Sequence, residues 1–202
     1  MKRAVVLVPG IHTTQKEAEA WRAGLEPRIL VACPDVVRVL LYTQGWISAF
    51  AIRFPWVGAA VRRRAVGRFQ RWVAETAQGL AEEFKTEVQL DAIGYSFGTY
   101  LVGHSMSDAP GPRSFWGRVA LMGSILSSRD DWSARAGHYQ QALNIYSPED
   151  EVVHFSTFGQ SGWAGFRRAP AVVRNREVRY EHGDYQRPGP AWKIATDFLA
   201  LT

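Results

Sequence analysis

Continuous apolar runs recur along the chain at intervals typical of buried strands. The first, Ala4-Val5-Val6-Leu7-Val8, has no polar alternation and is rich in β-branched residues. A strand of this kind is covered on both faces, as in a parallel sheet. Further short runs predict five more strands, at 36–42, 88–93, 118–123, 142–146 and 177–180.

Segments with helical periodicity lie between these runs. The first helix is predicted to begin after Thr14, which can form a capping box with Glu17, and to run to about Leu25, before Pro27. A long amphipathic helix is predicted over 59–84, where apolar positions recur at helical spacing with arginines between them. Shorter helices are predicted over 97–107, 130–140 and 190–201.

The alternation of strands and helices predicts an α/β fold with a mainly parallel sheet and helices on both faces. In such sheets, functional groups gather outside the carboxyl ends of the strands. The sequence has no internal repeat and no linker-like tract, so we expect one domain that covers 1–202.

Composition and charge narrow the class of protein. Hydrophobic residues make up 47% of the 202 residues and charged residues 21%, which is typical of a globular chain. The net charge is +5, with arginines clustered at 62–64 and 167–168. Such a balance permits binding to nucleic acid or to an anionic surface. No nucleic-acid-binding motif accompanies the charge, so we expect a solvated basic surface and no nucleic-acid partner.

The sequence gives no sign of export or membrane insertion. Cys33 is the only cysteine, which excludes an internal disulfide and argues weakly for a reducing compartment. The apolar run at 4–8 is shorter than the core of a signal peptide. The longest apolar stretch, 46–61, contains Arg53 and Pro55 and falls short of the roughly 20 residues that span a bilayer. We therefore expect a cytoplasmic protein without stable membrane insertion.

One motif carries candidate chemistry. Gly94-Tyr95-Ser96-Phe97-Gly98 matches G-x-S-x-G, and it lies between an apolar strand and an apolar helix. This turn presents a nucleophilic serine above the end of a strand. The serine takes a strained backbone conformation there, and the flanking glycines avoid collisions in the sharp turn.

A serine nucleophile needs an imidazole that accepts its proton. Among the five histidines, only His182 follows the last predicted strand. His104 lies well inside the helix after the serine and points away from the strand ends, and His138 is expected at the surface. His12 and His154 are candidates for the wall of a substrate pocket.

The imidazole needs a carboxylate that fixes its tautomer. Asp150 follows the fifth predicted strand, and the apolar pair Val152-Val153 after it would anchor that loop in the core. Two rival acids follow the preceding predicted strand; they are Asp130 and Asp131. The two glutamates next to Asp150, Glu149 and Glu151, are expected to be solvated.

Together these pieces resemble the α/β-hydrolase family, and most closely a compact serine esterase or lipase. The resemblance rests on four segments that span nearly the whole chain, Val8-Pro9-Gly10-Ile11, Gly94 to Thr99, Tyr146 to Val153 and Glu181-His182-Gly183. It implies a three-layer fold of about six strands that lacks the first two strands of the family. The implied strand order is 2-1-3-4-5-6.

The resemblance also implies a reaction. Ser96 would be the nucleophile, His182 the base and Asp150 the acid in the hydrolysis of a carboxylic ester through an acyl-enzyme. Thioester or amide hydrolysis would use the same groups. A non-catalytic binding protein with the same fold is the alternative from a different class.

The backbone N–H groups of Phe97 and Ile11 are the oxyanion donors that the resemblance implies. The turn after the first strand reads Pro9-Gly10 where the family usually has His-Gly. This departure leaves the choice between Ile11 and His12 open.

Two irregular segments are candidate lids or pocket rims, 43–57 and 152–171. We expect a small-molecule acyl substrate in a pocket lined by side chains from these segments and from the active-site turns, with His12, Tyr95, Trp46, His154 and Trp163 as candidates. No cluster has metal-ligand spacing and no phosphate-binding glycine loop is present, so we expect no metal and no cofactor.

Overall fold

The computed structural model describes residues 1–11, 13–43, 55–107, 114–154 and 159–201. Within these residues, six strands form one parallel sheet in the order β2-β1-β3-β4-β5-β6, which confirms the predicted order. The strands are β1 (Lys2–Val8), β2 (Val36–Leu41), β3 (Val88–Tyr95), β4 (Trp116–Met122), β5 (Tyr139–Tyr146) and β6 (Val173–Glu177).

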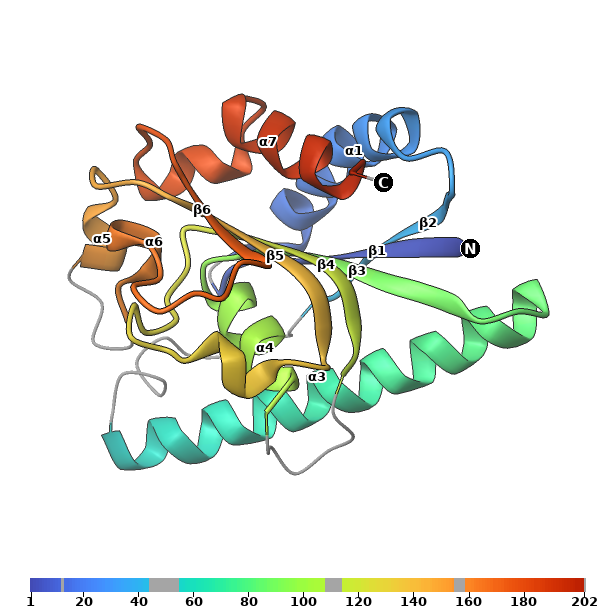
Figure 1. Cartoon of the computed structure of the whole chain (residues 1–202), viewed down its shortest axis with the longest axis horizontal. Coiled ribbons are helices and arrows are strands. Elements are labelled where there is room, and N and C mark those ends of the chain that lie inside the picture. The colour runs from blue at the N-terminus through green and yellow to red at the C-terminus, as the bar shows by residue number, and fades with distance from the viewer. Residues whose placement is uncertain (12, 44–54, 108–113, 155–158, 202) are drawn as a thin grey trace.

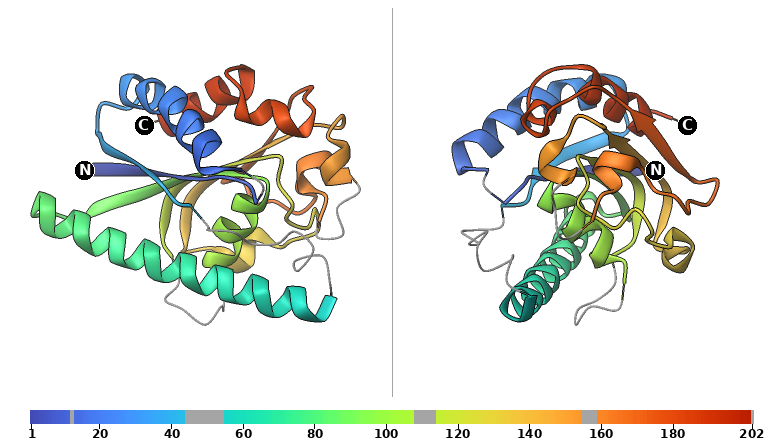
Figure 2. Two further views of the ribbon diagram at one scale, coloured as in Figure 1. Left: turned by 180° about the vertical axis from the view of Figure 1, so that it is seen from behind. Right: turned by 90° about the vertical axis from the view of Figure 1, so that its left-hand side faces the viewer.

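Helices cover both faces of the sheet, as predicted. One face carries α1 (Gln15–Ala32) and α7 (Pro190–Leu199), and the other carries α3 (Pro55–Phe84) and α4 (Phe97–Ser105) (Figures 1 and 2). Shorter elements lie near the carboxyl ends of the strands, α5 (Glu151–His154), α6 (Ser161–Ala164) and the 3-10 helix η2 (His182–Gln186). None of the helices in the described ranges is long and apolar enough to cross a membrane.

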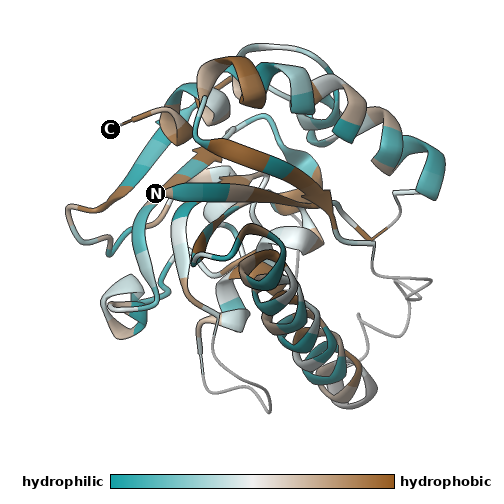
Figure 3. Ribbon diagram, turned by 90° about the vertical axis from the view of Figure 1, so that its right-hand side faces the viewer, coloured by the Kyte–Doolittle hydropathy of each residue, from teal (hydrophilic) through white to brown (hydrophobic). Residues whose placement is uncertain are grey.

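The core forms two layers, one on each side of the sheet. In β1, Val5 and Leu7 pack toward α1 and α7, whereas Val6 and Val8 pack toward α3 and α4, and all four are fully buried. The continuous apolar run thus has the two-sided burial that the sequence predicts. The central strands are accordingly largely hydrophobic (Figure 3).

The first helix is longer than predicted. It begins at the capping box of Thr14 and Glu17 as expected, but it continues through Pro27 to Ala32. Pro27 is exposed, so its ring projects into solvent, while Leu25 and Ile29 on the opposite side are fully buried. Burial of that face outweighs the backbone hydrogen bond that the proline forfeits.

Other boundaries also differ from the prediction. The long helix begins at Pro55 and not at 59, and the helix after the serine ends at Ser105. Only a 3-10 turn, η1 (Trp132–Arg135), forms within 130–140, and β5 already begins at Tyr139. Most of the irregular segment 43–57 lies outside the described residues.

The sixth strand was placed wrongly at 177–180. The strand that pairs with β5 is Val173–Glu177, and the chain after it leads into the histidine turn. Only Val173 in β6 is buried, because an edge strand has a neighbour on one side only. Its polar residues therefore hide the strand from a search for apolar runs.

A buried ion cluster lies toward the amino end of the sheet. Arg3 bonds Asp91 (2.9 Å), Asp35 (2.7 Å) and the carbonyl oxygen of Leu199 (2.9 Å). Asp91 is fully buried and also accepts the backbone N–H of Arg118 (2.7 Å). Burial raises the pKa of Asp91 to about 6, against the lowering effects of the Arg118 N–H and the Arg3 charge. Arg3 therefore neutralises a carboxylate that has no access to water.

Replacing Arg3 with leucine should lower the free energy of unfolding at pH 7 by about 3–5 kcal/mol, because Asp91 loses its counter-charge. The cost should shrink at pH 5, where Asp91, whose folded pKa lies above its unfolded value, becomes protonated. Urea titrations at both pH values measure this. Arg38→Leu breaks the exposed ion pair with Glu83 and should cost no more than about 1 kcal/mol. Equal effects of the two variants would contradict the account.

Candidate active site

The turn at Ser96 joins β3 directly to α4. Ser96 has φ 52° and ψ −120°, a conformation that a residue with a side chain rarely adopts. Its N–H donates to the carbonyl oxygen of Met122 (3.1 Å), and its carbonyl oxygen accepts the Thr99 hydroxyl (2.6 Å). These bonds on both sides of the residue hold the strained turn in place.

The glycines of the motif allow close packing around this turn. A Cβ at Gly98 would lie 1.9 Å from the carbonyl oxygen of Val8, so α4 sits directly on the end of β1. A Cβ at Gly94 would lie 3.1 Å from the backbone of Thr99. Position 98 therefore admits only glycine without a backbone shift, and position 94 has little space for any side chain.

Three side chains from distant parts of the sequence meet above this turn. Ser96 Oγ lies 2.9 Å from His182 Nε2, and His182 Nδ1 lies 2.8 Å from Asp150 Oδ2. Asp150 is fully buried, while the His182 side chain is 13% exposed. The carboxylate accepts a hydrogen bond, so it favours the tautomer with the proton on Nδ1 and leaves Nε2 free to accept from the serine hydroxyl.

The Asp150 loop is fixed by its own hydrogen bonds and by a glycine. The second carboxylate oxygen accepts the backbone N–H of Val153 (3.0 Å). Gly123 follows β4 with φ 55°, and a Cβ there would lie 3.2 Å from Asp150 Oδ2 and 3.0 Å from the Tyr185 ring. Gly123 was not among the predicted site residues, although a glycine directly after a strand end is a sequence signal for a turn of this kind.

The loops of Asp150 and His182 are tied to each other. The Ser147 hydroxyl accepts the backbone N–H groups of Glu149 (3.1 Å) and Tyr180 (3.0 Å). The Trp192 indole N–H donates to the carbonyl oxygen of Tyr185 (2.8 Å), which anchors the histidine turn to α7. The Asp150 and His182 loops are therefore held by one set of hydrogen bonds.

Tyr95 lies beneath His182. Its hydroxyl donates to the His182 carbonyl oxygen (3.0 Å), and the two ring centroids are 5.1 Å apart. Burial, followed by the charge of Asp150, raises the pKa of Tyr95, so its hydroxyl stays a neutral donor. Tyr95 was a candidate for the substrate pocket; the structure places it under the histidine turn, with 6% of its surface exposed.

The turn after β1 lies against Ser96. A Cβ at Gly10 would be 3.1 Å from Ser96 Cβ, which brings the backbone at Ile11 close to the serine. Phe97 is the first residue of α4, so its N–H has no acceptor within the helix and lies at the positive end of the helix dipole. The Gln186 side chain donates to Thr13 Oγ1 (2.8 Å) and joins this turn to the histidine turn.

The rival acids have other partners. Asp131 caps η1 by accepting the N–H of Ser133 (2.9 Å), and Asp130 pairs with Arg135 (3.0 Å). The His104 ring lies 4.1 Å from the Tyr100 ring within α4, and burial lowers the pKa of His104 to about 4. Asp150 is thus the carboxylate that lies within hydrogen-bond distance of His182.

The remaining pocket candidates divide into two groups. The rings of His154 and Trp163 lie 4.4 Å apart, and the Trp163 indole donates to the carbonyl oxygen of Pro148 (2.8 Å). Both residues are thus attached to the Asp150 loop. His12 and Trp46 lie outside the described residues. In the part of the chain that is described, no His, Cys, Asp or Glu cluster has the geometry of a metal site.

Comparison with known proteins gives structural matches only. No protein-family model matches the sequence, and no curated protein matches it either. Solved structures with similar folds include an esterase of Rhizomucor miehei, at 13% identity and a TM-score of 0.53 over 99% of this chain and 73% of that one.

Two further structures match at similar levels. A Lactobacillus plantarum WCFS1 protein assigned as a cell surface hydrolase has 10% identity and a TM-score of 0.52, covering 96% of this chain and 88% of that one. A bromoperoxidase of Bacillus anthracis has 14% identity and a TM-score of 0.52, with coverage of 99% and 90%. The chain has the α/β-hydrolase fold. In the sequence, the first strand of this sheet is β1, which leads into the Gly10 turn.

Gly98→Ala should destabilise the fold by about 3 kcal/mol, at the upper end of overpacking costs, because the methyl group would collide with the Val8 carbonyl. Gly79→Ala is the matched control. Gly79 lies inside α3 with no atom within 4 Å of a Cβ, so alanine should stabilise the protein by about 0.5–1 kcal/mol. Urea unfolding measures both, and a neutral Gly98→Ala variant would contradict the proposed packing of the turn on β1.

Proposed function

We propose that the protein is a serine hydrolase that cleaves carboxylic esters through an acyl-enzyme. The observation that carries the proposal is the continuous hydrogen-bonded chain from Ser96 through His182 to the buried Asp150. A serine, an imidazole and a carboxylate in this sequence of contacts are what acyl transfer near neutral pH requires.

In the first half of the reaction, Ser96 Oγ attacks the acyl carbon of the ester and transfers its proton to His182 Nε2. Asp150 stabilises the imidazolium through its bond to Nδ1. The oxyanion of the tetrahedral intermediate accepts hydrogen bonds from the backbone N–H groups of Phe97 and Ile11, which flank the serine. Collapse of the intermediate breaks the bond to the alkoxy group, and His182 protonates the departing alcohol.

In the second half, a water molecule replaces the alcohol. His182 takes a proton from the water while the oxygen attacks the acyl carbon, and the second tetrahedral intermediate uses the same two N–H groups. Its collapse releases the carboxylic acid and returns the proton to Ser96 Oγ. The imidazole accepts and returns one proton in each half, so the enzyme ends in its starting state.

Support for an ester substrate comes from the same fold in an esterase of Rhizomucor miehei. Hydrolysis of a thioester or an amide would use the same groups. Amide hydrolysis depends more strongly on protonation of the leaving group by His182, because an amine leaves less readily than an alcohol. A p-nitrophenyl ester series of increasing acyl length therefore tests both the reaction and the acyl pocket. Hydrolysis should be detectable with at least one acyl length and should disappear in Ser96→Ala.

Substitutions at the two candidate acids test whether Asp150 or Asp131 acts on His182. Asp150→Asn should lower kcat by about 10⁴-fold, because an amide in place of the carboxylate favours the wrong tautomer of His182. Asp131→Asn is the matched control and should leave kcat unchanged, since Asp131 caps η1. A large loss in Asp131→Asn with little loss in Asp150→Asn would overturn the assignment.

We also propose a positioning role for Tyr95. Tyr95→Phe removes the bond to the His182 carbonyl oxygen and should reduce kcat about 3- to 10-fold with little change in KM. Tyr146→Phe is the control, because it removes a bond to the exposed Glu177 carboxylate. Equal kcat values for the two variants would remove the role of Tyr95.

A further inference from the structure

The positive charge of the chain is concentrated in one stretch of the sequence. Residues 36–74 contain seven arginines and no acidic residue, so this stretch carries more positive charge than the net +5 of the whole chain. The rest of the chain is therefore slightly acidic in sum. Four of the seven arginines are exposed on α3 and are called the arginine face below; they are Arg63, Arg64, Arg68 and Arg71.

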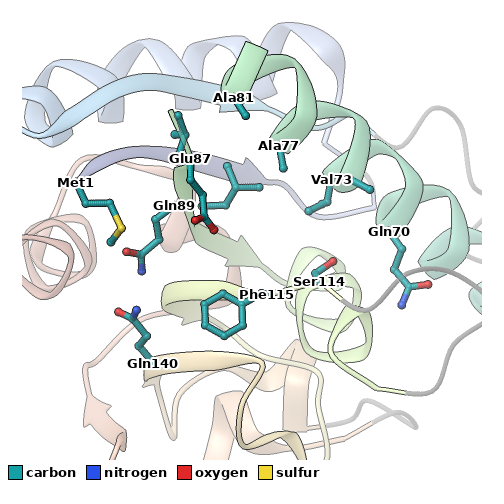
Figure 4. A pocket seen from close by; sticks show the side chains of 13 residues that line it. Met1, Gln70, Val73, Ala77, Ala81, Glu87, Gln89, Ser114, Phe115 and Gln140 are labelled. Carbon is teal, nitrogen blue, oxygen red and sulfur yellow. The ribbon is translucent and has the colours of Figure 1, made fainter. Parts of the chain in front are cut away.

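The arginine face lies on the side of α3 that is turned away from the sheet. Arg64, Arg68 and Arg71 follow one another at spacings of four and three residues, which places them in one line along the helix. Val73 and Ala77 point toward the strands instead, where they line a cavity of about 400 Å³ (Figure 4). The helix runs along one side of the molecule (Figures 1 and 2).

The exposed surface of this part of α3 has an unusual composition. Within 58–74, every exposed residue is an arginine of this face or an alanine; the alanines are Ala59, Ala60 and Ala74. No exposed side chain in this range has a carboxylate, an amide, a hydroxyl or an aromatic ring. Guanidinium groups are thus the polar side-chain groups that this surface offers to a partner.

The arginine face has no counter-charge in the part of the protein that the structure describes. None of its four side chains forms an ion pair or a hydrogen bond with a described residue. Glu75 lies one turn beyond Arg71, but no ion pair joins the two. Arg64 and Arg68 are one turn apart, and like charges at this spacing destabilise a helix.

Two other helices show how this chain pairs its surface cations. Arg22 of α1 lies 3.0 Å from Glu19, and Lys193 of α7 lies 2.6 Å from Asp197. Such pairs need an acid three or four residues away. The first 20 residues of α3 contain no acid, so a counter-charge for the arginine face has to come from another molecule.

The chemistry of the arginine face restricts that molecule. Guanidinium groups pair with phosphate and carboxylate oxygens. Single-stranded nucleic acids are held by aromatic side chains on which bases stack, but Trp72, the nearest aromatic residue, packs against Tyr42 and Phe69. The face therefore favours a partner that is bound through its phosphates alone. An anionic phospholipid layer is such a partner, and four or more basic residues on a helix are typical of binding to it.

We propose that the arginine face of α3 docks the protein on the surface of a membrane that is rich in anionic phospholipids. The guanidinium groups pair with lipid phosphates at the surface, while the apolar side of α3 stays buried in the core. None of the residues proposed for catalysis takes part, so the inference does not depend on the proposed esterase activity.

Sedimentation of the full chain with vesicles tests the proposal. Vesicles of phosphatidylcholine are compared with vesicles of phosphatidylcholine and phosphatidylglycerol. At low ionic strength, we expect partition into the anionic vesicles to be at least about tenfold higher, since each arginine near the surface contributes about fivefold. The preference should disappear in about 1 M salt, where the screening length is about 3 Å. Equal partition into both vesicles, or a preference that salt does not reduce, would overturn the proposal.

A pair of double variants locates the binding on α3. Arg68→Gln with Arg71→Gln should lower partition into anionic vesicles about 25-fold, at about fivefold for each arginine. Arg174→Gln with Arg176→Gln removes the same charge from exposed positions of β6, where Glu177 and Asp197 lie nearby, and should leave partition nearly unchanged. Equal losses in the two variants would show that only net charge matters and would reject the arginine face.

Competition separates a membrane from a nucleic acid as the partner. Duplex DNA of random sequence is added to the vesicle-bound protein at equal phosphate concentration. We expect most of the protein to stay on the anionic vesicles. Transfer of the protein to the DNA would identify nucleic acid as the preferred partner and would reject the membrane.

Discussion

The contact between the Ser96 turn and the end of β1 is the constraint on which the rest of the site depends. Gly98 lets α4 begin directly on the Val8 carbonyl, and no other residue fits there without a backbone shift. This contact, with the Met122 and Thr99 hydrogen bonds, offsets the strain of a positive φ at Ser96. The same approach brings the Gly10 turn to the serine, so one packing contact positions Ser96 together with the neighbouring backbone N–H groups.

The parallel sheet explains how late parts of the chain reach this point. In a parallel sheet, the turns that follow the strands all lie at the same edge. Ser96, Asp150 and His182 therefore lie close together although they are far apart in sequence. Hydrogen bonds of Ser147 and Tyr95 then fix the Asp150 and His182 loops relative to each other and to β3. The amino end of the sheet has a different character, with the Arg3–Asp91 ion pair and the cavity beside α3.

Much of this arrangement could be predicted from the sequence. Most of the strands and the turn at Ser96 follow from apolar runs and glycine spacing, whereas the strand order follows from the family resemblance. Asp150 and His182 are candidates because each follows a predicted strand in the order that the resemblance implies. Pro27 misled the prediction because tertiary burial of α1 outweighs a local helix breaker, and β6 was misplaced because an edge strand lacks an apolar run. The contact of Tyr95 with the histidine turn depends on which side chains meet, which no local pattern encodes.

The central claim is that Ser96 is a nucleophile activated by His182. The most direct measurement is reaction of the intact protein with a fluorophosphonate, followed by peptide mass spectrometry. The account predicts one phosphonyl adduct on Ser96, formed in the native protein, strongly slowed in His182→Ala and absent in Ser96→Ala. No adduct on the native protein, or an adduct that persists in Ser96→Ala, would contradict it.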